Sequence, residues 1–186
     1  PQGKNPLIIS GRLPCGDYSV AANISSQYIS GLLFALSVRE GESRLKLCGR
    51  VESAPYIEMT VSTLRTFGAN IEFDRENSLF IIKGKDKLSS PGEFTVGGDW
   101  SNAAFFLCAG AIGKNPVSVS GLDEGSTQGD RFVLSVLSKM GADIKAENGK
   151  ITVSPSHLHG TEIDAADIPD LVPILATVAS VSEGET

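Results

Sequence analysis

The sequence predicts an α/β protein assembled from repeated β-α-β-α-β-β units, and three internal similarities support this fold class. Residues Gly16–Ser26 are matched in residue type by Gly92–Asn102, and a third copy begins at Gly160–Asp170. An apolar segment typical of a helix follows each copy. The later halves of the first two units also agree, because Leu64–Ile71 is matched by Leu137–Ile144. Self-similarity of this kind indicates a supersecondary unit that recurs along the chain.

The first unit begins with an alternating strand that leads into a helix. Four residues at a spacing of four predict one apolar face of that helix, namely Ile24, Tyr28, Leu32 and Leu36. The second helix is expected to start near Pro55, which suits a first helical turn, and to stop at Gly68, a usual residue just after a helix. The other expected elements are a strand at Tyr18–Ala22, the first helix at Tyr28–Val38, and strands at Arg44–Cys48, Ile71–Phe73 and Leu79–Lys83.

The second unit repeats this order, and the third begins it. Asn148-Gly149 is the strongest hairpin signal of the chain, and Gly141 is expected to end the second helix of the unit. The expected elements are strands at Phe94–Gly98, Pro116–Ser120, Asp143–Ala146 and Lys150–Val153, with helices at Ala104–Ile112, at about Asp130–Met140 and, in the third unit, at Leu171–Val181. The third unit stops before a second helix and hairpin, which would leave an apolar face uncovered. We therefore expect a piece of a longer protein, with a short natural chain as the alternative.

The composition excludes several classes of function. The chain has 186 residues, with 16 Lys and Arg against 22 Asp and Glu, and its formal net charge is -6. A general nucleic-acid binder needs a basic face instead. The longest apolar runs are shorter than the roughly 20 residues of a membrane-spanning helix, and we expect no signal peptide. Three widely spaced cysteines are typical of reduced thiols in a cytosolic protein. We expect a cytoplasmic protein with no nucleic-acid or membrane partner.

Metal binding has one weak signal, the alternating pair His157 and His159. A metal site needs further ligands that are not nearby, and a solvated strand end or loop is the simpler interpretation. We expect no metal and no cofactor.

The predicted helix starts carry the residues that could do chemistry. Ser25 and Ser26 lie beside free backbone N–H groups at the positive end of a helix, where a phosphate can bind, although serine is also a preferred helix cap. Ser53 and Tyr56 open the second helix, where Ser53 as a cap and Tyr56 as a core-edge aromatic are the simpler interpretation. Asp170 at a later helix start is either a carboxylate that favours the helix dipole or a general base or ligand for sugar-like hydroxyls.

Four segments resemble a known family in order and approximate spacing. These segments are Asn23–Ser30, Ser53–Tyr56, Gly98–Ala104 and Asp167–Asp170, and together with the rest of the chain they are similar to 5-enolpyruvylshikimate-3-phosphate synthase over essentially all residues. Trp100 and Asn102 depart from the family, which often has a small residue and Ser there. The resemblance implies transfer of the enolpyruvyl group of phosphoenolpyruvate to the 5-hydroxyl of shikimate 3-phosphate with release of phosphate, a step of the shikimate pathway toward chorismate and the aromatic amino acids.

The resemblance also assigns roles within a two-domain enolpyruvyl-transferase-like architecture. Residues 1–97 would be the last part of one domain and residues 98–186 the first part of the other, truncated in its second unit, with a hinge near Gly97-Gly98. The implied binding residues for shikimate 3-phosphate are Ser25, Ser26, Gln27, Ser53, Tyr56 and Asp170. Gln27 would also bind phosphoenolpyruvate, and Asp170 would accept a proton.

Two other functions remain open. UDP-N-acetylglucosamine enolpyruvyl transferase has a similar fold but lacks the pair formed by Ser-Ser-Gln and Ser-x-Pro-Tyr, and a non-catalytic repeat protein would use its helix starts only for capping. The family's Lys and Arg residues for phosphoenolpyruvate fall outside this sequence. We therefore expect the 186 residues alone to be inactive.

Overall fold

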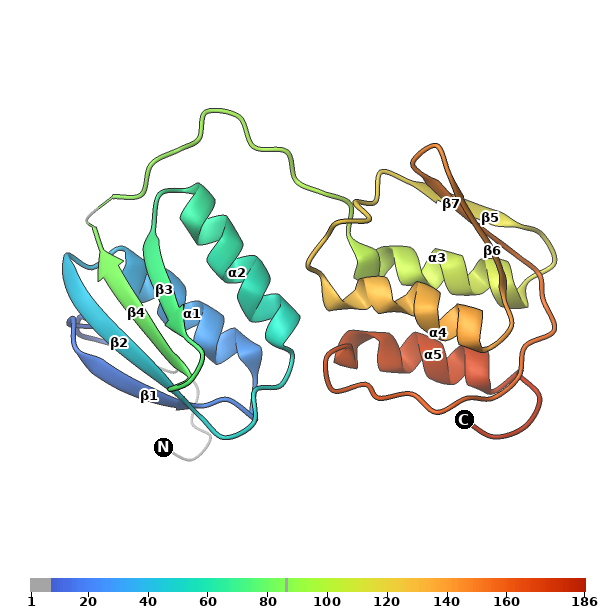
Figure 1. Cartoon of the computed structure of the whole chain (residues 1–186), viewed down its shortest axis with the longest axis horizontal. Coiled ribbons are helices and arrows are strands. Elements are labelled where there is room, and N and C mark those ends of the chain that lie inside the picture. The colour runs from blue at the N-terminus through green and yellow to red at the C-terminus, as the bar shows by residue number, and fades with distance from the viewer. Residues whose placement is uncertain (1–7, 86) are drawn as a thin grey trace.

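The computed structural model describes residues 8–85 and 87–186, which form two lobes with separate hydrophobic cores. The first lobe comprises residues 17–84 and the second comprises residues 100–179. Residues 87–99 run between the lobes without a helix or strand, as the connection at the top of Figure 1 shows. Among the described residues, no helix combines the length and hydrophobicity that a bilayer crossing requires.

The first lobe is one complete β-α-β-α-β-β unit. Its elements are β1 (Asp17–Ala21), α1 (Ser26–Ser37), β2 (Gly41–Cys48), α2 (Ala54–Thr66), β3 (Asn70–Asp74) and β4 (Leu79–Gly84). The sheet order is β1-β2-β4-β3, in which β1 pairs with β2 in parallel and the other pairs are antiparallel. Both helices cover one face of this sheet (Figure 1), so that the core lies between them and alternate residues of β2 and β4.

The elements of the second lobe are α3 (Trp100–Ile112), β5 (Val117–Ser120), the 3-10 helix η1 (Gly129–Phe132), α4 (Val133–Lys139), β6 (Asp143–Glu147), β7 (Lys150–Ser154), the 3-10 helix η2 (Pro169–Leu171) and α5 (Val172–Ala179). This lobe packs α3 and α4 against a smaller sheet, and α5 packs against α3. The sheet is antiparallel in the order β5-β7-β6. α3 contacts both α4 and α5 (Figure 1), and the buried Trp100 anchors the core at the start of α3.

Hydrogen bonds at the ends of α2 and α4 confirm the predicted repeat. Gly68 and Gly141 both have the left-handed φ, of 84° and 93°, that a residue just after a helix commonly takes. The next residue donates back to the preceding helix in both copies, because Ala69 N bonds to Leu64 O and Ala142 N bonds to Leu137 O, each at 2.9 Å. Pro55 lies in the first turn of α2, as predicted.

The predicted apolar face of α1 is confirmed at Leu36, which is buried, and at Leu32, which packs against the core, but it is wrong at its first two positions. Ile24 precedes the helix and is 66% exposed, and Tyr28 is 59% exposed. Ile29 and Leu33 join Leu36 in the core in their place. An α-helix has 3.6 residues per turn, so residues four apart are rotated by about 40° relative to one another. A row of residues at a strict spacing of four therefore does not stay on the buried face of the helix.

The second and third units depart from the prediction at their first strands. Residues 94–98 and 160–168 contain no strand, and α3 begins at Trp100, before the predicted Ala104. The predicted helix at 130–140 is divided into η1 and α4, and that at 171–181 corresponds to α5, which directly follows η2 and ends at Ala179. The remaining predicted strands, including the hairpin at Asn148-Gly149, are confirmed within one residue, except that β2 begins at Gly41, three residues before the predicted Arg44.

Candidate functional site

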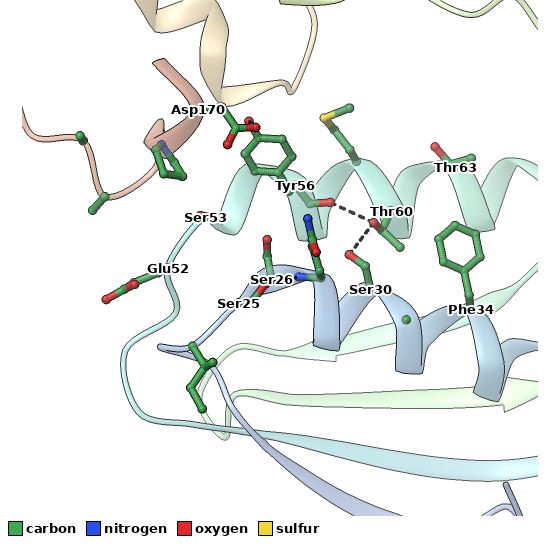
Figure 2. Close-up of a pocket in the computed structure, with 17 residues that line it drawn as sticks. Ser25, Ser26, Ser30, Phe34, Glu52, Ser53, Tyr56, Thr60, Thr63 and Asp170 are labelled. Atoms are coloured by element: carbon green, nitrogen blue, oxygen red, sulfur yellow. Dashed lines mark hydrogen bonds between the residues drawn. The ribbon is translucent and has the colours of Figure 1, made fainter. Parts of the chain in front are cut away.

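A cavity of about 750 Å³ lies where the starts of α1 and α2 face a loop of the second lobe. The first lobe supplies most of the lining, and residues 165–170 of the second lobe close one side (Figure 2). All six binding residues predicted from the resemblance line this cavity, namely Ser25, Ser26, Gln27, Ser53, Tyr56 and Asp170. The fold thus brings Ser25 and Asp170, which are 145 positions apart in the sequence, to the same cavity.

The start of α1 presents hydroxyls and backbone donors to the cavity. Ser25 is the N-cap of α1, and its Oγ accepts a hydrogen bond from Gln27 N at 3.2 Å. The capping interpretation of Ser25 is therefore confirmed as one role of this side chain. Ser26 follows as the first helical residue and is buried. The first backbone N–H groups of a helix and its dipole together favour an anion at this position.

Ser53 does not act as the helix cap that its position suggests. Its φ of 55° and ψ of 39° lie in the left-handed region, and its side chain makes no capping hydrogen bond to α2. A non-glycine residue in this conformation costs about 1–2 kcal/mol. Its backbone N–H donates to Ala166 O of the second lobe at 3.3 Å, so Ser53 sits where the two lobes touch, with its side chain unused by the helix.

Tyr56 connects the cavity to the second lobe. Its hydroxyl lies 2.6 Å from Asp130 Oδ2 and 3.2 Å from Asp170 Oδ2. Burial, followed by the hydrogen bond to Asp130 and the negative charge of Asp130, raises the pKa of Tyr56 well above its ordinary value. The tyrosine therefore stays protonated at neutral pH and serves as a hydrogen-bond donor.

Asp170 lies in η2, directly before α5, and is exposed. Figure 2 shows its carboxylate next to the Tyr56 ring at the rim of the cavity. The predicted placement at a helix start is confirmed in the form of a 3-10 turn that leads into α5. A carboxylate here is open to a ligand in the cavity.

The cavity is rich in hydroxyls and poor in positive charge. Its charged lining residues are Glu52 and Asp170, and none of the lining residues that the structure describes is Lys or Arg. Within the described part of the chain, no three His, Cys, Asp or Glu side chains come together as metal ligands would. This arrangement can bind a phosphate through helix N-termini and serines, and a polyol through Asp170 and Tyr56.

The sequence prediction missed a second row of polar lining residues. Ser30 Oγ and Thr60 Oγ1 are 2.8 Å apart across α1 and α2, and Thr60 Oγ1 donates to Tyr56 O at 3.0 Å (Figure 2). Both lie four residues after a predicted site residue, Ser26 and Tyr56, so the helical spacing could have found them. Asp130 was also missed, and no sequence signal links it to Tyr56.

Comparisons with known proteins agree over the whole chain. The family model described as EPSP synthase (3-phosphoshikimate 1-carboxyvinyltransferase) matches residues 1–186. A 3-phosphoshikimate 1-carboxyvinyltransferase of Clostridium novyi is 41% identical over 181 residues, which cover 97% of this chain and 41% of the relative. The chain therefore spans less than half the length of this relative.

Solved structures share the arrangement of the elements. EPSP synthase from Acinetobacter baumannii matches with a TM-score of 0.68 and 26% identity, covering 93% of this chain and 40% of that chain. The enolpyruvyl transferase NikO from Streptomyces tendae matches in fold, with a TM-score of 0.71 and 21% identity, covering 94% of this chain and 44% of that chain. Taken with the family match over residues 1–186, these similarities show that the chain belongs to the EPSP synthase (3-phosphoshikimate 1-carboxyvinyltransferase) family.

Proposed function

We propose that this chain is part of a cytoplasmic enzyme that transfers the enolpyruvyl group of phosphoenolpyruvate to the 5-hydroxyl of shikimate 3-phosphate and releases phosphate. The observation that carries this proposal is that Ser25, Ser26, Ser53, Tyr56 and Asp170 line one and the same cavity. The relative from Clostridium novyi is named for the same reaction.

The starts of α1 and α2 form the phosphate side of the proposed site. Ser25 and Ser26 would donate hydroxyl hydrogen bonds to the phosphate of shikimate 3-phosphate, supported by the dipole of α1. Ser53 would donate a further hydrogen bond to this phosphate, because its side chain makes no capping bond to α2 and its hydroxyl is available to a ligand. A strained residue beside a cavity often serves binding.

The other end of the cavity would hold the shikimate ring. Asp170 would accept hydrogen bonds from the ring hydroxyls and take a proton from the attacking hydroxyl, and Tyr56 would line this side. Gln27 would lie between the two substrates. The proposed products are then 5-enolpyruvylshikimate 3-phosphate and inorganic phosphate, with no metal or other cofactor.

The domain boundary near Gly97-Gly98 remains part of the proposal. Ser89 and Phe94 contact the first lobe, since Ser89 N donates to Phe67 O at 2.8 Å and the rings of Phe94 and Phe67 lie 5.5 Å apart. Gly98 N instead donates to Gly121 O of the second lobe at 3.2 Å. The change of partner between Phe94 and Gly98 supports a hinge at this point.

We further propose that this chain alone binds shikimate 3-phosphate weakly and does not turn over. Phosphoenolpyruvate is a compact anion that needs several converging cations, and the cavity lining contains no Lys or Arg among the described residues. The missing cations would come from the rest of the longer protein.

Calorimetry with two ligands tests the proposed substrate. Shikimate 3-phosphate should bind the chain, and UDP-N-acetylglucosamine should not. Preference for the UDP-sugar would support the alternative transferase, and binding of neither by the longer protein would support a non-catalytic repeat protein.

A further inference from the structure

Asp130 is a fully buried carboxylate in the second lobe, with an exposed fraction of 0%. Its Oδ2 accepts hydrogen bonds from the hydroxyl of Ser101 and from Gln128 Nε2, the latter at 3.3 Å. Tyr56 OH of the first lobe donates to the same oxygen at 2.6 Å. Among the described residues, Asp130 Oδ1 has no hydrogen-bond partner.

This environment is costly for a carboxylate unless its donors stay in place. A buried charge without an opposite charge is destabilising, and the penalty falls with each hydrogen bond that the charge accepts. Two donors come from the second lobe itself, whereas Tyr56 comes from α2 of the first lobe. Separating the lobes would therefore remove one of the three donors to Asp130.

The contact between Tyr56 and Asp130 also determines whether the carboxylate of Asp170 is available to a ligand in the cavity. A tyrosine hydroxyl has a single proton to donate. That proton is directed to Asp130 at 2.6 Å in preference to Asp170 at 3.2 Å. The carboxylate of Asp170 is consequently left free to accept a hydrogen bond from a ligand.

We propose that Asp130 is a positioning residue that fixes Tyr56 across the lobe boundary and thereby holds the cavity closed with Asp170 free. The identity of the ligand rests on the function proposed above, whereas the closure of the lobes does not. Asp130 itself does not line the cavity, so its effect on a ligand passes through Tyr56.

Energy transfer between the lobes tests this proposal without any ligand. The energy donor is Trp100, the single tryptophan, which is buried in the second lobe. The acceptor is a dye attached to the exposed Cys48 of the first lobe, in a Cys15→Ser background so that Cys15 is not labelled. Tyr56→Phe and Asp130→Asn should each lower the transfer efficiency. Ser101→Ala is the matched control, because it removes a bond to the same oxygen within one lobe and should leave the efficiency unchanged.

Binding of shikimate 3-phosphate to the same variants gives the second readout. Tyr56→Phe and Asp130→Asn should each weaken binding by about tenfold, and the double variant should bind no more weakly than Tyr56→Phe, because both substitutions act on one hydrogen bond. Tyr56→Phe removes the donor of this bond, and Asp130→Asn replaces its charged acceptor by a neutral amide oxygen that accepts more weakly. Trp100 emission checks that the second lobe remains folded in Asp130→Asn. If that variant unfolds, Tyr56→Phe still tests the proposal, because it removes only the hydroxyl that contacts Asp130.

The possible outcomes separate the two proposals. Lower transfer efficiency in both variants, together with no binding of shikimate 3-phosphate by the longer protein, would support the positioning role and overturn the proposed substrate. Unchanged transfer efficiency in Tyr56→Phe, or additive losses of binding in the double variant, would overturn the positioning role even if shikimate 3-phosphate binds.

Discussion

The two lobes start from similar sequences yet differ where each first strand meets its helix. In the first lobe, β1 pairs in parallel with β2, and Ala22 N extends the ladder by donating to Cys48 O at 2.9 Å. In the second lobe only the corresponding last bond remains, from Gly98 N to Gly121 O. A side chain at Gly98 would place its Cβ 2.4 Å from Gly121 O, so this close approach requires glycine.

The helix that follows also starts at different points. The N-caps are Ser25 for α1 and Asp99 for α3, although Ser25 is matched in sequence by Ser101, two residues after Asp99. The turn is thus two residues shorter in the second copy. Ser25 faces the cavity as a result, whereas Ser101 donates to the buried Asp130. A small shift in a turn gives the same sequence pattern a binding role in one lobe and a structural role in the other.

Thiol reactivity should show the largest difference between the lobes. Cys48 of the first lobe is exposed, and burial raises the pKa of Cys108 in the second lobe to about 12. Because the thiolate is the reactive species, this rise alone slows Cys108 by roughly a thousandfold relative to a free cysteine. Time-resolved labelling with Ellman's reagent should give early reaction of Cys48 and reaction of Cys108 only on unfolding. Rapid labelling of Cys108 in the native chain would contradict the compact second core.

Core truncation tests whether the lobes fold as separate units. Leu33 and Leu107 are both 0% exposed, one in each core. Leu→Ala at either position should cost about 2–5 kcal/mol. In urea unfolding, Trp100 fluorescence should respond strongly to Leu107→Ala and little to Leu33→Ala. Equal shifts of the Trp100 transition in the two variants would indicate one cooperative unit.

Loss of the Asp170 charge should reduce catalysis without unfolding the protein. Asp170→Asn retains shape and hydrogen-bonding capacity but cannot act as a base, so turnover in the longer enzyme should fall by about a hundredfold or more. A phosphate-release assay measures turnover, and thermal melting is the control because exposed Asp170 contributes little to packing. Normal turnover of Asp170→Asn would assign the base to another residue.

The two matched serines should differ in ligand binding. In the longer enzyme, Ser25→Ala should weaken shikimate 3-phosphate binding by roughly tenfold or more, since a charge-assisted hydrogen bond contributes about 1.5–3 kcal/mol. Ser101→Ala is the control from the second copy and should leave affinity within about twofold, because Ser101 does not line the cavity. Calorimetry would contradict this assignment if both variants bound as the parent does.

The N-caps of α3 and α1, Asp99 and Ser25, should respond differently to acid, so that a falling pH lowers the free energy of unfolding at the cap of the second lobe only. The hydrogen bond from Gln128, assisted by donors from Ser101 and Asn102, lowers the pKa of Asp99. A lowered pKa stabilises the folded state above the unfolded value of about 4, and this stabilisation is lost as pH falls further. Ser25, the cap of α1, does not titrate. Asp99→Asn should therefore flatten the pH dependence of the Trp100 unfolding transition between about pH 5 and 2, and an unchanged profile would exclude Asp99 as its source.

The sequence predicted most of the fold because the repeated signals were local. Pro55, Gly68 and Gly141 fix helix ends through their own backbone preferences, and these ends are confirmed. The strand expected at Phe94–Gly98 is absent because alternation shows only that a segment is able to pair. Phe94 instead packs against Phe67 of the first lobe, a partner that alternation does not identify.

The candidate site was predictable only in part for the same reason. Ser25, Ser26 and Gln27 are adjacent at one helix start, and the family resemblance linked them to Ser53, Tyr56 and Asp170. Ser53 has a left-handed backbone and donates to Ala166 of the other lobe, a contact between distant segments that no local sequence signal indicates. Asp130 meets Tyr56 across 74 positions of sequence, a contact that exists only after both lobes have folded.

A crystal structure with bound shikimate 3-phosphate tests the central claim most directly, namely that the cavity between the lobes is a substrate site. We predict the phosphate at the starts of α1 and α2, within hydrogen-bond distance of the hydroxyls of Ser25, Ser26 and Ser53, and the ring hydroxyls at Asp170. Shikimate 3-phosphate bound outside this cavity, or with its phosphate turned toward Asp170, would contradict the account.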